Sequence, residues 1–300
     1  MKFQFQQAVR ALILLAFCTM IYKLHETGEI TKFINPKYET LSQTAAILFF
    51  ILFLIQLTRI FTTSKHCHHE EHHCNHDHGD SPFKTKKLVS YMILSLPLFT
   101  GFLLPARALD ASIAEKKGAM LILTNQSQTS ITQETSDKTN NGDSTNSDIV
   151  DQILLEEKQD MKKDEFELLI KHLAQSPKVE MNDYNFSSYY MDINKNMANY
   201  LGKEINLKGF IFKEEGMAQN QLVLSRFLIT HCVADASTIG FLSELPEAST
   251  LEEDTWIEAQ GIIETTTYDG AVLPIIKITN WHTIAEPSIP YLYPINILIL

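Results

Sequence analysis

Long apolar stretches are concentrated in the first third of this 300-residue chain. A helix needs about 20 mostly apolar residues to cross the hydrocarbon core of a bilayer, which is about 30 Å thick. Residues 41–61 and 88–104 meet this requirement, and Pro97 predicts a kink in the second run. We therefore predict membrane spans over about residues 41–61 and 88–104.

The apolar run nearest the N-terminus, residues 11–22, is shorter and admits two interpretations. It has the length of a signal-peptide core, but no cleavage pattern of small residues follows it. As a short span over about residues 9–24, it would let the long side chain of Arg10 reach the polar interface. We favour the span, so residues 1–109 are expected to form a membrane region with two to three spans.

The lysines and arginines beside these runs predict an orientation, because cytoplasmic loops carry an excess of positive charge. The loop between the second and third runs, with its flanks, carries Arg59, Lys65, Lys84, Lys86 and Lys87, and the N-terminus adds Lys2 and Arg10. The opposite side carries Lys23, Lys32, Lys37, Arg107, Lys116 and Lys117. The comparison favours a cytoplasmic loop and an extracytoplasmic C-terminal domain in a multi-pass protein of the cell membrane.

The same loop, residues 65–80, holds seven of the chain's eleven histidines together with two cysteines. Imidazole and thiolate are ligands that Zn²⁺ prefers. The candidate metal ligands are His66, Cys67, His68, His69, His72, His73, Cys74, His76 and His78. The expected cofactor is Zn²⁺ or a similar divalent metal, although so many donors specify no single tetrahedral set. The alternative is a solvated linker whose metal binding has no biological role.

Polar residues dominate residues 124–147, which cannot bury enough apolar surface to offset the entropy of ordering. We predict a flexible linker over residues 110–147 and a soluble domain over residues 148–300. Helical periodicity after Asp148 and again after Asp164 predicts a short helical pair at the start of that domain. A third helix is expected from Asp192 to Gly202.

Five strand-like segments complete the domain, at residues 204–212, 222–229, 231–236, 255–263 and 275–284. Several short strands with alternating apolar residues, and a glycine in the first, predict a small closed barrel of the oligonucleotide/oligosaccharide-binding (OB) type. The predicted fold class is therefore a membrane α-helical region followed by a soluble α+β domain with an OB-like five-stranded barrel. A β-sandwich fragment is the alternative.

Charge and motifs narrow the possible functions of this domain. The net charge of −11 argues against a nucleic-acid partner, because phosphate binding needs clustered lysine and arginine. No set of residues fills the nucleophile, base and oxyanion roles, so we expect no enzymatic activity. His231, Cys232 and Asp235 form a second candidate metal site, although adjacent residues of an extended strand point to opposite faces. In the alternative interpretation, Cys232 is a small buried core residue.

The order of these parts resembles the YcgQ-type bacterial membrane proteins, a family described as permease subunits. The resemblance is carried by the sequences LPARALD at residues 104–110, GKEINLKG at residues 202–209 and CVAD at residues 232–235, and by the strands around Trp256 and Trp281. It implies membrane helices, a variable loop that is often rich in histidine, and an OB-like extracytoplasmic domain. Family members often have a second cysteine where this chain has His231.

The resemblance also implies a separate multi-span permease as partner, beside membrane lipid. None of the three apolar runs contains an internal Asp, Glu or Lys, which favours an accessory role over a self-sufficient transporter. We hypothesise an accessory subunit of a membrane permease that handles a divalent metal such as zinc. The alternatives are a stand-alone membrane-anchored metal sensor or buffer, and a cell-envelope binding module in which the histidine tract is incidental.

Overall fold

The structure is a computed structural model that describes residues 4–60, 85–104, 107–117, 143–214, 216–268 and 270–298. Its internal contacts divide the chain into two compact units, Met1–Arg107 and Ala108–Leu300. The first unit contains the apolar helices and the second contains all the described strands.

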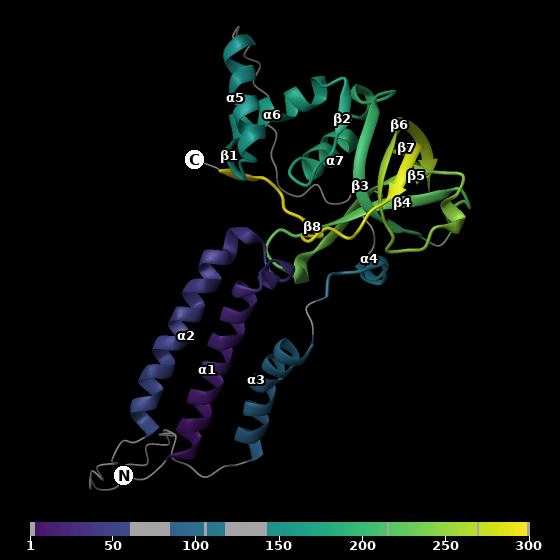
Figure 1. Cartoon of the computed structure of the whole chain (residues 1–300). Coiled ribbons are helices and arrows are strands. Elements are labelled where there is room, and N and C mark those ends of the chain that lie inside the picture. The colour runs from purple at the N-terminus through teal and green to yellow at the C-terminus, as the bar shows by residue number, and fades with distance from the viewer. Residues whose placement is uncertain are drawn as a thin grey trace. The chain divides into compact units, whose positions relative to one another are not determined.

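The N-terminal unit contains three apolar helices, α1 (Phe5–Glu26), α2 (Glu39–Ile60) and α3 (Thr85–Leu103). Two 3₁₀ turns, η1 (Glu29–Lys32) and η2 (Pro36–Tyr38), join α1 to α2, which lie side by side (Figure 1). Two helical stretches, Phe5–Glu26 and Pro36–Ile60, are long and apolar enough to cross a membrane, whereas the apolar part of α3, Val89–Leu103, is shorter. Apolar helices are thus confirmed at all three predicted positions, and two of them have spanning length.

The side chains of α2 present a large apolar surface on the outside of this unit. Ile47, Leu48 and Ile51 are 62%, 55% and 47% exposed, respectively. A contiguous exposed apolar surface of this kind marks a membrane or a protein interface.

The helices of the C-terminal unit are α4 (Ala111–Lys117), α5 (Asp143–Glu156), α6 (Lys163–Gln175) and α7 (Phe186–Lys195). The predicted helical pair is confirmed by α5 and α6, which pack against each other. The third helix was predicted to start at Asp192, but α7 starts six residues earlier, at Phe186. The earlier start is set by a turn that asparagine side chains stabilise. Asn182 Oδ1 accepts hydrogen bonds from the amides of Tyr184 and Asn185 at 3.1 and 2.9 Å, so the helix begins at Phe186.

The strands form two sheets. They are β1 (Asp160–Lys162), β2 (Lys178–Glu180), β3 (Glu204–Phe212), β4 (Gln221–Leu228), β5 (Ser237–Glu244), β6 (Trp256–Tyr268), β7 (Ala271–Thr283), β8 (Tyr291–Leu292) and β9 (Asn296–Leu298). β1 and β9 form a parallel pair, and the other strands form a mixed sheet in the order β2-β3-β6-β7-β5-β4-β8 (Figure 1). An additional antiparallel pairing joins β3 to β4, and β5 pairs in parallel with β7.

Four of the five predicted strands are confirmed by β3, β4, β6 and β7. The third strand was predicted in the wrong place. Residues 231–236 form a turn that includes the 3₁₀ segment η4 (Val233–Asp235), and β5 starts at Ser237 instead. The Asp235 carboxylate accepts backbone hydrogen bonds within this turn, so the chain cannot be extended there.

Two apolar clusters hold this unit together. The larger one joins α5, α6 and α7 to the side chains of β3–β7. The smaller one lies on another face of the sheet, where Ala111 and Ala114 of α4 pack against Phe210, Phe212 and Trp256. The first part of the segment that was predicted as a linker, residues 111–117, is therefore a helix that packs on the domain.

Candidate functional site

The histidine-rich loop, with all nine of its candidate ligands, lies outside the described residues. Its zinc site remains a prediction. Within the part of the chain that the structure describes, no group of three or more His, Cys, Asp or Glu side chains is arranged to hold a metal ion.

The second candidate site, His231, Cys232 and Asp235, lies in the turn between β4 and β5. One oxygen of the Asp235 carboxylate accepts from the backbone N–H of His231 at 2.8 Å and lies 2.9 Å from His231 Nδ1. The other oxygen accepts from the backbone N–H of Cys232 at 3.3 Å. Partial burial raises the pKa of Asp235, but these hydrogen bonds outweigh it and leave the pKa below its ordinary value.

This geometry brings the three residues together but uses the carboxylate to shape the turn. The His231 side chain is 66% exposed, and the Cys232 thiol is half-buried rather than a core residue. A structural zinc site needs about four ligands. The turn therefore supplies at most part of a ligand set, and its metal role remains a prediction.

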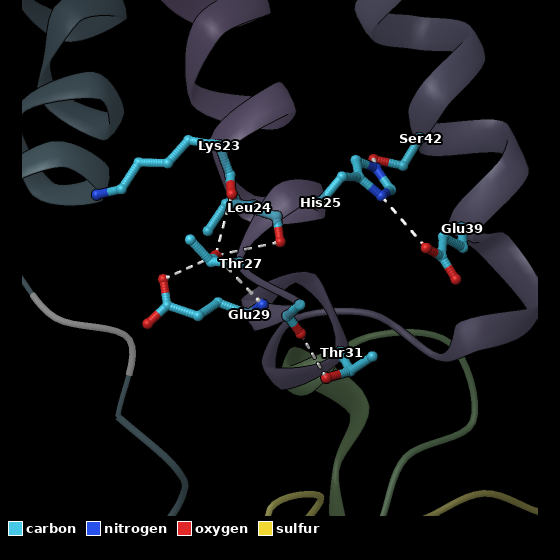
Figure 2. Close-up of polar contacts among 9 residues, drawn as sticks. Lys23, Leu24, His25, Thr27, Glu29, Thr31, Glu39 and Ser42 are labelled. Atoms are coloured by element: carbon cyan, nitrogen blue, oxygen red, sulfur yellow. Dashed lines mark hydrogen bonds and ion pairs between the residues drawn. The ribbon is translucent and has the colours of Figure 1, made fainter.

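The junction between α1 and α2 holds polar contacts that sequence reasoning missed (Figure 2). His25 Nε2 lies 3.1 Å from Ser42 Oγ. His25 Nδ1 lies 3.5 Å from Glu39 Oε1, close enough for an ion pair when the ring is protonated but not aligned as a hydrogen bond. The His25 side chain is only 11% exposed, so this contact fixes the turn between the two helices.

Two further polar contacts tie the apolar helices together. Gln56 Nε2 of α2 donates to the side chain of Gln7 of α1, and both residues are buried. Arg10 Nε of α1 donates to Tyr91 Oη of α3 at 3.0 Å. Hydrogen bonds between side chains of this kind stabilise helix pairs in a membrane. Among the described residues, the polar groups inside this unit therefore serve packing.

A buried cation in the C-terminal unit was also missed. Arg226 of β4 is 1% exposed, and its Nη1 donates to Asp183 Oδ1 at 2.7 Å. Its guanidinium carbon lies 5.1 Å from the centroid of the Trp256 ring and 6.0 Å from that of Phe186. Burial lowers the pKa of Arg226, which nevertheless stays protonated at neutral pH. No local sequence signal shows that an arginine in a strand will be buried.

Comparisons with known proteins cover both units. The DUF1980 N-terminal domain matches residues 9–120, and the DUF1980 C-terminal domain matches residues 156–294. The UPF0703 protein YcgQ of Bacillus subtilis (strain 168) is 31% identical over 298 residues, which is 95% of this chain and 98% of that protein. The chain belongs to the YcgQ family. The resemblance seen in the sequence is thereby confirmed.

A second relative is similar to this YcgQ-family chain along its whole length. It comes from Streptococcus mutans serotype c (strain ATCC 700610 / UA159) and is named as a subunit of a two-component membrane permease complex. It is 27% identical over 289 residues, covering 95% of this chain and 98% of that protein. Neither relative is named as an enzyme. The apolar helices and this relative together point to a membrane location.

Proposed function

We propose that this YcgQ-family chain is an accessory subunit of a membrane permease. The observation that carries the proposal is its full-length similarity to a relative named as a permease complex subunit. The exposed apolar face of α2 supports it, because this face offers a surface for helices of a multi-span partner. The polar contacts described in the N-terminal unit hold its own helices together and outline no transport path.

We further propose that the C-terminal domain is an OB-like barrel. The described pairings run from β3 through β6, β7, β5 and β4 and then return from β4 to β3. Five strands joined in a circuit support a closed barrel, in which no central strand keeps a free edge. The domain would bind a partner or a ligand on the extracytoplasmic side, as the lysine and arginine distribution predicts.

The proposed cargo is a divalent metal, with zinc the leading candidate. Its support is compositional, since nine His and Cys donors lie between residues 66 and 78. In this proposal, the loop collects or senses the ion on the cytoplasmic side and the barrel contacts the permease on the other side.

Photo-crosslinking in native membranes tests the permease proposal. A photoreactive residue at Ile51, which is 47% exposed on α2, should link the chain to one multi-span protein in stoichiometric amount. The matched control is a photoreactive residue at Gln56, which is 9% exposed and contacts Gln7, so it should link only within the chain. If Ile51 crosslinks only to lipid and the chain purifies without a second protein, the accessory-subunit proposal is wrong.

A further inference from the structure

A groove of about 890 Å³ opens in the N-terminal unit between α1, η1 and α3. Its apolar part is lined by Met20, Leu24, Pro97 and Phe102. Gly101 of α3 faces α1 there, and a Cβ at this position would lie 2.5 Å from Met20 Sδ. A cavity of this size is within the range of about 300–1,000 Å³ that holds small ligands.

Two cations line the groove as well, Lys23 of α1 and Arg107 just beyond α3. Figure 2 shows the Lys23 side chain extending away from the His25 and Glu39 contact. Among the described residues, neither the Lys23 ammonium nor the Arg107 guanidinium has an ion-pair or hydrogen-bond partner. Lys23 lies in the last turn of α1, at the level where lysines of a spanning helix meet lipid headgroups.

The other polar groups of the groove offset only part of this positive charge. Glu29 is the one acidic residue in the described lining, and its Oε2 accepts from Thr27 Oγ1 at 3.4 Å. The Thr27 hydroxyl shares its one proton between this carboxylate and the backbone carbonyl of Lys23, and the Thr100 hydroxyl donates to the backbone carbonyl of Pro97. The described lining thus carries two positive charges and one negative charge above an apolar floor.

We propose that this groove binds an anionic phospholipid. The acyl chain would lie on the apolar floor, and the phosphate would contact Lys23 and Arg107. This occupant matches both parts of the lining, because it joins an apolar chain to an anion in one molecule. A purely apolar helix of a partner would leave the two cations in contact with hydrocarbon, which is costly. A soluble anion would leave the apolar floor uncovered.

Lipid titration of the full chain in non-ionic detergent tests the proposal. Native mass spectrometry should show tighter binding of dioleoyl phosphatidylglycerol than of dioleoyl phosphatidylcholine. Lys23→Gln and Arg107→Gln should each weaken phosphatidylglycerol binding about fivefold, the loss expected for one cation near an anionic headgroup, and leave phosphatidylcholine binding unchanged. The matched control is Lys37→Gln, a cation of the same unit outside the groove, which should change neither.

A second variant addresses the apolar part of the groove. Thr100→Trp should fill the floor and weaken binding of both lipids, while the variant elutes as the wild-type chain does. Equal binding of the two lipids, or phosphatidylglycerol binding that Lys23→Gln and Arg107→Gln leave intact, would overturn the proposal. The proposal is also overturned if a photoreactive residue introduced at Thr100 crosslinks to a partner protein in membranes and not to phosphatidylglycerol.

Discussion

Arg226 and Asp183 form an ion pair with very unequal solvent exposure. The Arg226 side chain is 1% exposed, the Asp183 side chain is 63% exposed, and Nη1 lies 2.7 Å from Oδ1. Two other nitrogens of the guanidinium, Nε and Nη2, are buried and have no hydrogen-bond partner among the described protein atoms. The pair connects β4 to the turn before α7, so a single carboxylate at the surface compensates a charge in the interior.

We predict that Asp183→Asn lowers the free energy of unfolding of the C-terminal unit by about 2 kcal/mol. The loss stays below the 3–5 kcal/mol of a fully buried pair, because Asp183 is largely solvated. Urea unfolding followed by tryptophan fluorescence, to which Trp256 beside Arg226 contributes, measures it. The matched variant Asp183→Asn with Arg226→Met should recover most of the loss, since it also removes the buried charge. An Asp183→Asn protein as stable as the wild type would show that the ion pair does not stabilise the domain.

The segment that enters the C-terminal unit should be required for its full stability. The Ala111 amide donates to Asp254 Oδ1 at 2.6 Å, and the Leu109 amide donates to Tyr291 Oη at 2.9 Å. Ala114 of α4 is fully buried. We expect a fragment of residues 108–300 to be more stable than one of residues 143–300, which keeps α5 whole, by about 2 kcal/mol, from roughly 1 kcal/mol per hydrogen bond. Chemical unfolding of both fragments checks this, and equal midpoints would exclude a stabilising role for α4.

Gly240 in β5 and Gly270 in the turn between β6 and β7 allow steric crowding to be distinguished from backbone strain. A Cβ at Gly240 would lie 2.5 Å from the Leu224 carbonyl oxygen, so Gly240→Ala should cost about 3 kcal/mol through overpacking. The control, Gly270→Ala, meets open space at a φ of +78° and should cost about 1 kcal/mol from strain alone. Unfolding midpoints of the two variants should fall in that order. The reverse order would mean that β4 and β5 can move apart at low cost.

A carboxylate at the start of α6 should make the free energy of unfolding of the C-terminal unit depend on pH. A backbone hydrogen bond from Lys162, together with the hydrogen bond from the Lys158 side chain, holds the pKa of Glu165 below its ordinary value of 4.5. The stabilisation is present above that value and is lost as the pH falls through the lower pKa of the folded state. Glu165→Gln should therefore flatten the fall in unfolding midpoint between about pH 5 and pH 3. The control Glu167→Gln, at a largely exposed side chain 3.9 Å from Lys163, should leave the curve unchanged.

Zn²⁺ binding by the histidine-rich loop can be tested separately. A peptide of residues 65–80 should bind Zn²⁺ at neutral pH and bind it more weakly near pH 5, because imidazole must lose its proton to coordinate. Replacing Cys67 and Cys74 with serine should weaken binding moderately, whereas replacing the histidines should abolish it. Calorimetric titration measures each case. Zn²⁺ binding that persists after all the histidines are replaced would contradict this prediction.

Patterns along the chain predicted the elements whose signal is local. Apolar runs of membrane length identified the helices, and alternation in residues 204–212 identified β3. β5 was missed for a physical reason. Six consecutive residues in its middle, from Thr238 to Ser243, are buried, as six are in β4, so neither strand alternates as a strand with one exposed face does. β4 still carries an uninterrupted apolar run, Leu222 to Leu224, whereas Gly240 interrupts the apolar residues of β5. The turn at residues 231–236 instead mixes apolar and polar residues as a half-buried strand would.

Other features of this protein were decided only by the tertiary structure. His25 meets Ser42 across a helical hairpin, Arg226 meets Asp183 43 residues away, and Ala111 meets Asp254 143 residues away. Each contact depends on which surfaces meet after the helices and strands have formed, and a short-range pattern does not encode that choice. Hydrophobic periodicity shows which face of an element is buried. Which buried polar groups pair, and which cations line a groove, follows from three-dimensional packing alone.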